Sequence, residues 1–196
     1  MEDLQNIALF DMDGTLCDHD KALFRDLELL RSPSEKQYKN LAEKDIPAYV
    51  LKRANLIRVQ EYWWQTLPKF KLGWDVLEEA KKLEYKIMIL TQGPKSKPHA
   101  WSGKMKWIDK HLPGVDVTIT RDKGLVYGKV LVDDFPPYIE RWLEHRKRGL
   151  VIMPANEYNS NFKHPNVIRY DGENLKEVKR GLEIALTRKP EKPLIL

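Results

Sequence analysis

The chain has 196 residues, 42% of them hydrophobic, which allows one well-packed core with a small accessory part and excludes a disordered protein. The net charge of +5 favours anionic ligands, among them phosphate esters and nucleic acid. Cys17 is the only cysteine, so a disulfide framework and a cysteine-based zinc site are excluded and a reducing cytoplasm is expected. Because no apolar stretch is long enough to span a bilayer and the first residues include the acids Glu2 and Asp3, we expect neither a membrane span nor a secretory signal.

Short apolar runs bounded by polar or turn residues predict the strands. In chain order they cover residues 7–10, 87–90, 115–119, 130–132, 150–152 and 167–168. Amphipathic segments of helical length lie between them, at residues 74–83, 101–112, 137–148 and 175–186. Strand and helix alternate from residue 73 onward, which predicts an α/β fold with a Rossmann-like parallel sheet flanked by helices.

Residues 18–72 have helical periodicity, around 23–30 and 49–64, and no convincing strand. We expect a small helical cap, inserted after the first strand and lying over the carboxyl ends of the sheet, where open α/β folds bind ligands. The predicted division is therefore a core of residues 1–17 and 73–187, a cap of residues 18–72 and a C-terminal tail of residues 188–196.

The first predicted strand leads into the segment Asp11-Met12-Asp13-Gly14-Thr15-Leu16. Two carboxylates placed two residues apart at a strand end can project toward the same face. Gly14 permits a sharp turn whose amides can point at an anion. One carboxylate can then attack a phosphate while the other moves a proton.

The segment 11–16 resembles the first motif of the haloacid dehalogenase (HAD) superfamily, in its phosphatase branch. The other motifs follow in order: a strand ending in Thr91 resembles the second, Lys123 stands where the lysine of the third belongs, and Asp133 and Asp134 resemble the acid pair of the fourth. The resemblance covers nearly the whole chain. It implies a Mg²⁺-dependent phosphomonoester hydrolase.

The resemblance implies a distinct role for each acid. Asp11 is the nucleophile that forms an aspartyl-phosphate, and Asp13 protonates the leaving group and then activates water. Crowding against Asp11 is expected to raise the pKa of Asp13. Mg²⁺ is expected to bind Asp11, the backbone carbonyl of Asp13 and an acid of the pair Asp133 and Asp134.

A closer resemblance, to the 5'(3')-deoxyribonucleotidase family, lies in residues 99–112 and 119–123. It implies that Lys104 and Lys123 lie near the phosphate of a nucleotide substrate. The chain departs from this family at Gln92, where serine is usual, and at His19, where an aromatic residue is common. The predicted phosphate-binding set is Gly14, Thr91, Gln92, Lys104 and Lys123.

Aromatic residues of the cap are candidates for stacking on a nucleobase. Trp63 and Trp64 end a predicted helix, and His19 stands just inside the cap. Stacking is worth ~1–3 kcal/mol per base in single-strand binding proteins. The alternative, which we favour for the tryptophans, is packing of the cap against the core.

Other charged residues are interpreted as surface features. We expect Lys95, Lys97 and Lys106 to be solvated. The basic residues 146–148 are expected in the last turn of a helix, where they complement the helix dipole, rather than on nucleic acid. The histidines lack the spacing of a metal site.

The leading hypothesis is a cytoplasmic Mg²⁺-dependent 5'(3')-nucleotidase that acts on (deoxy)nucleoside monophosphates. The first alternative is a HAD phosphatase or mutase acting on sugar phosphates or on nucleic-acid 3'-phosphate ends. The second is a binding module for nucleotides or nucleic acid without catalysis. The expected partner is a small phosphate monoester; nucleic acid is less favoured, and a homodimer is compatible with the sequence.

Overall fold

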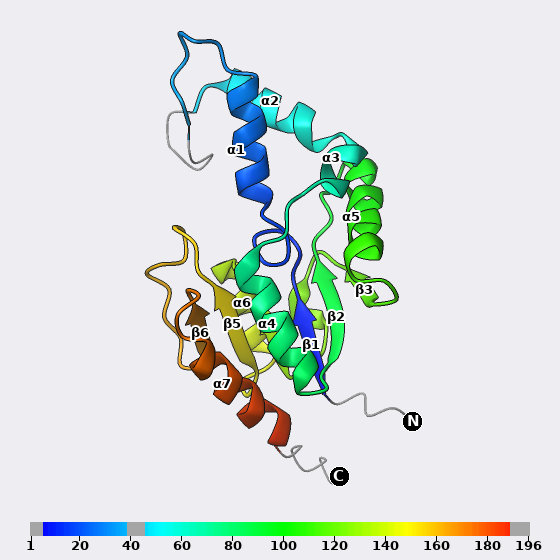
Figure 1. Ribbon diagram of the computed structural model, residues 1–196, viewed down its shortest axis with the longest axis vertical. Helices are drawn as coiled ribbons and strands as arrows, with labels where there is room; N and C mark the ends of the chain where they lie inside the picture. The colour runs from blue at the N-terminus through cyan, green and yellow to red at the C-terminus, as the bar shows by residue number, and fades with distance from the viewer. Residues whose placement is uncertain (1–5, 39–45, 189–196) are drawn as a thin grey trace.

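A six-stranded parallel sheet forms the centre of the computed structural model, which describes residues 6–38 and 46–188 (Figure 1). The strand order is β3-β2-β1-β4-β5-β6. The strands are β1 (Ile7–Phe10), β2 (Lys86–Thr91), β3 (Asp116–Ile119), β4 (Val130–Val132), β5 (Leu150–Pro154) and β6 (Val167–Tyr170). This confirms the predicted α/β fold, with each predicted strand found at its place in the chain.

Both faces of the sheet are covered, which explains why the strands are apolar runs without polar alternation. In β1, Ala8 and Phe10 join one buried cluster while Ile7 and Leu9 join a second cluster on the opposite face. The first cluster includes side chains of α4 (Lys71–Lys82), α5 (Pro98–His111) and α7 (Leu175–Thr187). The second is closed by α6 (Pro136–Glu144).

The strand order creates a crevice between β1 and β4. The chain leaves β1 for β2 on one side and leaves β4 for β5 on the other, and open α/β sheets bind ligands at such a reversal. Phe10 pairs with Val132, and the Asp11 N–H donates to the Val132 carbonyl at 2.9 Å. The residues that follow β1 and β4 therefore meet at one edge of the sheet.

Helices inserted after β1 form the cap: α1 (His19–Leu29), α2 (Ala48–Arg58) and α3 (Glu61–Gln65). They lie beyond the carboxyl ends of the strands (Figure 1), which confirms a helical insertion at this point. The linkers into and out of the cap are joined by two bonds, Asp18 N–H to the Pro68 carbonyl at 2.8 Å and Phe70 N–H to the Leu16 carbonyl at 2.9 Å. The exact division of the chain into core and cap stays a prediction.

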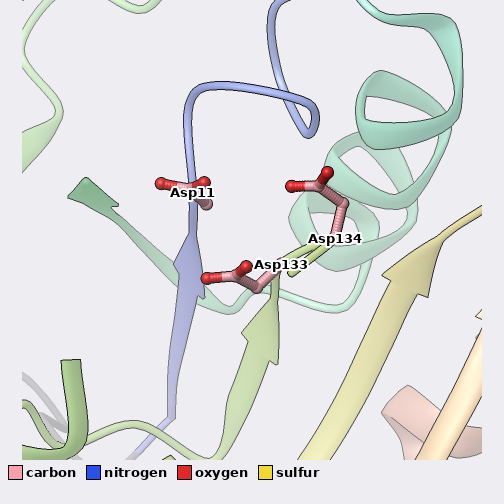
Figure 2. A group of neighbouring side chains, drawn as sticks. All are labelled: Asp11, Asp133 and Asp134. Atoms are coloured by element: carbon pink, nitrogen blue, oxygen red, sulfur yellow. The ribbon is translucent and has the colours of Figure 1, made fainter. Parts of the chain in front are cut away.

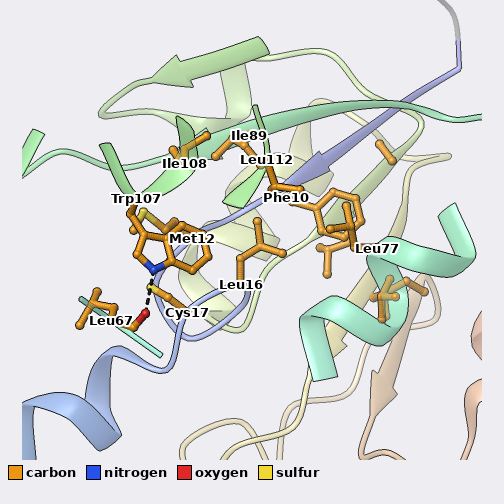
Figure 3. Packing of buried hydrophobic residues seen from close by; sticks show 14 of the residues in the cluster. Phe10, Met12, Leu16, Cys17, Leu67, Leu77, Ile89, Trp107, Ile108 and Leu112 are labelled. Carbon is orange, nitrogen blue, oxygen red and sulfur yellow. Dashed lines mark hydrogen bonds between the residues drawn. The ribbon is translucent and has the colours of Figure 1, made fainter. Parts of the chain in front are cut away.

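Trp107 of α5 fastens the outgoing linker to the core. The indole is fully buried beside Met12 and Leu16, and its Nε1 donates to the Leu67 carbonyl at 2.7 Å (Figure 3). Burying an aromatic ring of this size stabilises the junction, and the bond satisfies the ring's one donor.

Helix α3 of the cap packs closely on α5 at Gly103. A Cβ at this glycine would lie 2.5 Å from the Glu61 carbonyl oxygen and 2.6 Å from Trp64 Cβ. The absence of a side chain is therefore what lets the two helices approach each other here.

Some element boundaries differ from those predicted. Helix α6 ends at Glu144 rather than at residue 148, because the chain turns there, with the Gly149 N–H bonded to the Arg146 carbonyl. The expected placement of residues 146–148 in a last helical turn is therefore wrong. Residues 49–64 form two helices, with a break at Val59 and Gln60.

The predicted tail of residues 188–196 begins at the C-cap of α7, and residues 189–196 lie outside the described residues. Among the helices that are described, none has the length and apolar character needed to cross a membrane.

Candidate active site

Asp11, Asp133 and Asp134 bring their carboxylates together at the ends of β1 and β4 (Figure 2). Each offers an oxygen, and these oxygens lie within 4.8 Å of one another. Burial raises the pKa of Asp133 to about 6, and burial followed by Asp133 and Asp11 raises the pKa of Asp134 well above its ordinary value. A hard divalent cation would relieve this crowding, so the donor set fits Mg²⁺.

Lys123 neutralises part of this acid cluster. Its side chain is buried, and Nζ lies 2.7 Å from Asp11 Oδ1 and 2.6 Å from Asp133 Oδ2. Burial alone would lower the pKa of Lys123, but the two carboxylates raise it. The lysine is therefore held charged next to the predicted nucleophile.

Lys104 of α5 joins the motif turn to the end of β2. Its buried Nζ donates to Asp13 Oδ2 at 2.7 Å, to Thr91 Oγ1 at 3.0 Å and to the Gln92 carbonyl at 3.0 Å. The structure thus gathers these predicted residues from distant parts of the chain. Together the ammonium and the hydroxyl offer donors to a phosphoryl oxygen.

The expectation that the pKa of Asp13 is raised is wrong. Burial does oppose ionisation of this carboxyl, but Lys104, His19 and Lys123 outweigh burial and lower its pKa. The physical reason is the direct bond from Lys104, which lies on a helix 91 residues away in the sequence.

Gly14 forms the predicted turn, but its amide does not point at an open site. Its φ is +71°, and a Cβ here would lie 2.6 Å from Asp134 Cγ, so glycine permits both the turn and the approach of Asp134. Its N–H donates to the Cys17 carbonyl at 2.9 Å. The amide is therefore engaged in the turn itself.

A cavity of about 620 Å³ lies over these groups and reaches the cap. We call the core residues Asp11, Asp13, Thr91, Lys104 and Asp134 the floor, and the cap residues His19, Asp20, Arg58 and Trp64 the roof. The two groups meet where Lys104 Nζ lies 5.1 Å from the centroid of the Trp64 ring. Between them the wall is formed by Gln92, Pro94, Lys97, Arg121, Phe135 and Tyr138. The volume is that of an ordinary small-molecule site.

The three candidate stacking residues occupy different places. His19 and Trp64 line the cavity, whereas Trp63 is not among its lining residues and its Nε1 donates to Asp26 at 2.7 Å. The two tryptophan rings meet edge to face, with centroids 5.0 Å apart. Packing therefore accounts for Trp63, and stacking on a base stays a prediction for His19 and Trp64.

Gln92 lies in the wall beside Arg121. With its amide oxygen turned to the guanidinium, Gln92 accepts from Arg121 at 3.1 and 3.2 Å. Arg121 Nη1 also donates to the Gly93 carbonyl at 2.8 Å. Arg121 follows β3 at the carboxyl edge of the sheet, and this position was a signal that could have identified it as a site residue.

Two cations of the cavity were missed or misjudged. Arg58 was not predicted, because no local motif marks the last residue of α2. Lys97 was expected to be solvated; it is partly exposed, but it also lines the wall of the cavity, where its Nζ donates to Asn55 Oδ1 at 2.9 Å.

Polar residues after β5 hold Asp134 in place. Asn156 Nδ2 donates to Asp134 Oδ2 at 2.9 Å, and the buried Asn159 donates to the Asp134 carbonyl at 3.0 Å. Arg169 in turn donates to Asn159 Oδ1 at 3.0 Å and to the Asn156 carbonyl at 3.1 Å. Sequence reasoning missed this network, although it too follows the carboxyl end of a strand.

Comparisons with known proteins agree with this geometry. The model of the family described as "5' nucleotidase, deoxy (Pyrimidine), cytosolic type C protein" matches residues 5–176. No curated protein matches the chain.

Solved structures show the same fold. A haloacid dehalogenase-like hydrolase from Burkholderia xenovorans LB400 is 16% identical, with a TM-score of 0.52 over 91% of this chain and 98% of that one. A HAD family hydrolase from Deinococcus radiodurans R1 is 10% identical, with a TM-score of 0.50 over 93% of this chain and 95% of that one. At these identities, the similarity shows a shared HAD-like fold and nothing further.

Proposed function

The chain belongs to the deoxy (pyrimidine) 5' nucleotidase family, cytosolic type C, of HAD hydrolases, and on this premise we propose that it cleaves (deoxy)nucleoside monophosphates through an aspartyl-phosphate on Asp11. The observation that carries the proposal is the position of the Asp11 carboxylate, which lies at the cavity floor beside the buried Lys123 and within reach of two further acids. The cytosolic description of the family agrees with the location expected from the single cysteine.

Binding of the phosphate falls to donors at the floor and next to it. Lys104 and the Thr91 hydroxyl lie together, and Lys123 lies beside Asp11, 2.7 Å from its Oδ1. These groups neutralise charge on the phosphoryl oxygens and position the phosphorus for in-line attack, which is most of what a protein contributes to phosphoryl transfer.

The reaction then needs two steps. In the first, an Asp11 oxygen bonds to phosphorus while the bond to the ester oxygen breaks, and Asp13 gives its proton to the departing nucleoside. In the second, Asp13 takes a proton from water, the water oxygen bonds to phosphorus, and the bond to Asp11 breaks to release phosphate. Both acids line the same cavity, as these steps require.

Mg²⁺ is the cofactor that the acid cluster fits, held by Asp11 and by Asp133 or Asp134, with the Asp13 carbonyl as a predicted further ligand. When bound, it supplies positive charge that lowers repulsion between a carboxylate and a phosphate.

Asp13 must carry a proton before the first step, although Lys104 lowers its pKa. A phosphate oxygen that accepts a hydrogen bond from Lys104 weakens the bond between Lys104 and Asp13. Substrate binding is therefore expected to raise the pKa of Asp13 toward the value of an acid catalyst.

A phosphate-release screen tests the proposal. Deoxynucleoside 5'- and 3'-monophosphates, sugar phosphates and 3'-phosphorylated oligonucleotides are compared with Mg²⁺ present, in the wild type and in Asp11→Asn. We expect nucleotides to be the best substrates and Asp11→Asn to lose about 10⁴-fold or more of the activity, as enzymes do when a nucleophile is removed. Higher activity on sugar phosphates or oligonucleotides would reject the substrate class, and full activity in Asp11→Asn would reject the mechanism.

A further inference from the structure

Four lysine and arginine side chains line the cavity, and Arg58 differs from the other three. Lys97, Lys104 and Arg121 each donate a hydrogen bond to a neighbouring residue. The guanidinium of Arg58 has no hydrogen bond or ion pair with any residue in the ranges 6–38 and 46–188. It is the cation at the roof that the protein itself leaves available.

The surroundings of Arg58 make an unpaired guanidinium unfavourable when no ligand is bound. Burial lowers the pKa of Arg58, and the nearby acids Asp20 and Asp13 only partly compensate. Asp20 is bonded to His19 at 2.8 Å instead of to the guanidinium. A cation that has lost water without gaining a partner is stabilised strongly by an incoming anion.

The backbone of Arg58 is fixed in place. Its carbonyl, at the end of α2, accepts from Trp64 Nε1 at 2.9 Å, and Trp64 is itself buried against α5. The side chain of Arg58 therefore extends into the cavity from a main chain that is held in place.

Lys97 provides a second cation near the first. Burial and then the charge of Arg58 lower the pKa of Lys97, so the two side chains are close enough to repel each other. The amide of Asn55 holds Lys97 through a single neutral bond, which leaves its remaining donors for a ligand. An anion near both side chains would relieve the repulsion.

We propose that Arg58 and Lys97 form a second anion-binding position, which takes a second phosphate group of the substrate and makes nucleoside bisphosphates preferred over monophosphates. This inference rests on the proposed function, because Lys104 at the floor and Lys123 beside Asp11 are assigned to the phosphate that is cleaved. The fork of an arginine matches a phosphate, and a nucleotide bears its extra anions as phosphates.

Binding measurements test the inference without depending on catalysis. In the Asp11→Asn background, calorimetry gives the affinities for deoxyuridine 5'-monophosphate and deoxyuridine 3',5'-bisphosphate with Mg²⁺ present. We expect the bisphosphate to bind about tenfold more tightly, as suits charge-assisted bonds to one added phosphate. Adding Arg58→Gln is expected to bring the ratio of the two affinities close to one.

Two further variants make the result specific. Lys97→Gln is expected to lower the same ratio, which covers the case in which Arg58→Gln disturbs the cap. Lys52→Gln removes an exposed charge from the same helix, outside the cavity, and is expected to keep the ratio. Equal affinities for the monophosphate and the bisphosphate in Asp11→Asn would overturn the inference. So would a ratio of affinities that stays unchanged in both Arg58→Gln and Lys97→Gln.

Hydrolysis by the wild type separates the two proposals. Cleavage of the monophosphate without preferential binding of the bisphosphate leaves the proposed function standing and rejects the second anion position. Preferential binding that depends on Arg58, without cleavage of either nucleotide, supports the second position and rejects the proposed function.

Discussion

The cations at the floor and at the roof of the cavity differ in their hydrogen-bond partners. At the floor, Lys104 has three hydrogen-bond partners, and the neighbouring Lys123 lies between two carboxylates. At the roof, the guanidinium of Arg58 has no hydrogen bond or ion pair among the described residues, whereas His19 and Asp20 are bonded to each other. The floor is built from strand ends and one core helix, whereas the roof is built from the inserted cap.

The difference separates donors that are held in place before a ligand binds from a cation that gains a partner only when the ligand binds. Donors fixed by other bonds cost little reorganisation during a reaction, which suits the end where charge moves. A cation without a partner instead gains most of its stabilisation when the ligand arrives, which suits recognition. The chemistry and the selectivity of this protein are therefore expected to respond to different substitutions.

The largest loss of activity is expected from Lys123→Met. The change leaves Asp11 and Asp133 without the cation between them, and we expect kcat to fall about 10²–10³-fold, as when a group that stabilises transition-state charge is removed. Loss of one partner of a buried pair is also expected to destabilise the fold by about 3–5 kcal/mol. Phosphate release and thermal unfolding measure the two effects.

Lys129→Met is the matched control for this variant. Lys129 is also buried, but it precedes β4 at the opposite edge of the sheet and donates to Asn6 and to the Leu186 carbonyl. We expect it to lower the unfolding temperature while kcat of the folded protein stays close to wild type. Equal losses of kcat in the two variants would mean that Lys123 acts through stability alone.

A smaller effect is expected from Asn156→Ala. The substitution removes the donor that orients the Asp134 carboxylate, and loss of a hydrogen-bond partner of a metal ligand changes metal affinity about 10–100-fold. We expect the Mg²⁺ concentration for half-maximal activity, and the Mg²⁺ dissociation constant from calorimetry, to rise about tenfold. Glu157→Gln, in the exposed part of the same loop, should leave both values unchanged. An unaltered Mg²⁺ affinity in Asn156→Ala would contradict the assigned role.

The smallest effect concerns the stability of the protein without metal. Because the folded-state pKa values of Asp133, about 6, and of Asp134 are raised, these two carboxyls bind more protons in the folded protein than in the unfolded chain above about pH 4. Their contribution to stability is therefore expected to fall as pH rises from about 4 through 6. At pH 8, Asp134→Asn should raise the unfolding temperature by about 2–4 °C, equivalent to about 1 kcal/mol.

Mg²⁺ should reverse the order of the unfolding temperatures of the wild type and Asp134→Asn. It is expected to stabilise the wild type, whose acid cluster it neutralises, and to have less effect on Asp134→Asn. Asp109→Asn, on the exposed face of α5, is the control for loss of one negative charge. If metal-free Asp134→Asn unfolds at the same temperature as the wild type at pH 8, or gains no more than Asp109→Asn, the raised pKa values would be contradicted.

The sequence was sufficient for the sheet and for the floor because both depend on short-range signals. Apolar runs with turn residues at their ends predicted the strands, and parallel strands bring their carboxyl ends to one edge. Asp11, Thr91 and Asp133 each stand at such an end, so their convergence followed from the fold. Lys104 was found through the family resemblance, since nothing local marks it.

The position of Arg58 at the roof and the lowered pKa of Asp13 could not be predicted in this way. Arg58 occupies the cavity because α2 ends against Trp64, which is a matter of tertiary packing. The lowered pKa of Asp13 depends on a contact with Lys104 that no spacing rule supplies. Asn156 and Arg121, by contrast, follow strands directly, and a uniform search of every strand end would have included them.

The close approach of α3 to α5 at Gly103 links the two ends of the cavity mechanically. The cap rests on this glycine through Glu61 and Trp64, and the next residue, Lys104, reaches the floor. Helix α5 thus carries both the contact with the cap and the ammonium that holds Thr91 and Asp13. A displacement of α3 against α5 is therefore expected to disturb the alignment of the phosphate-binding donors.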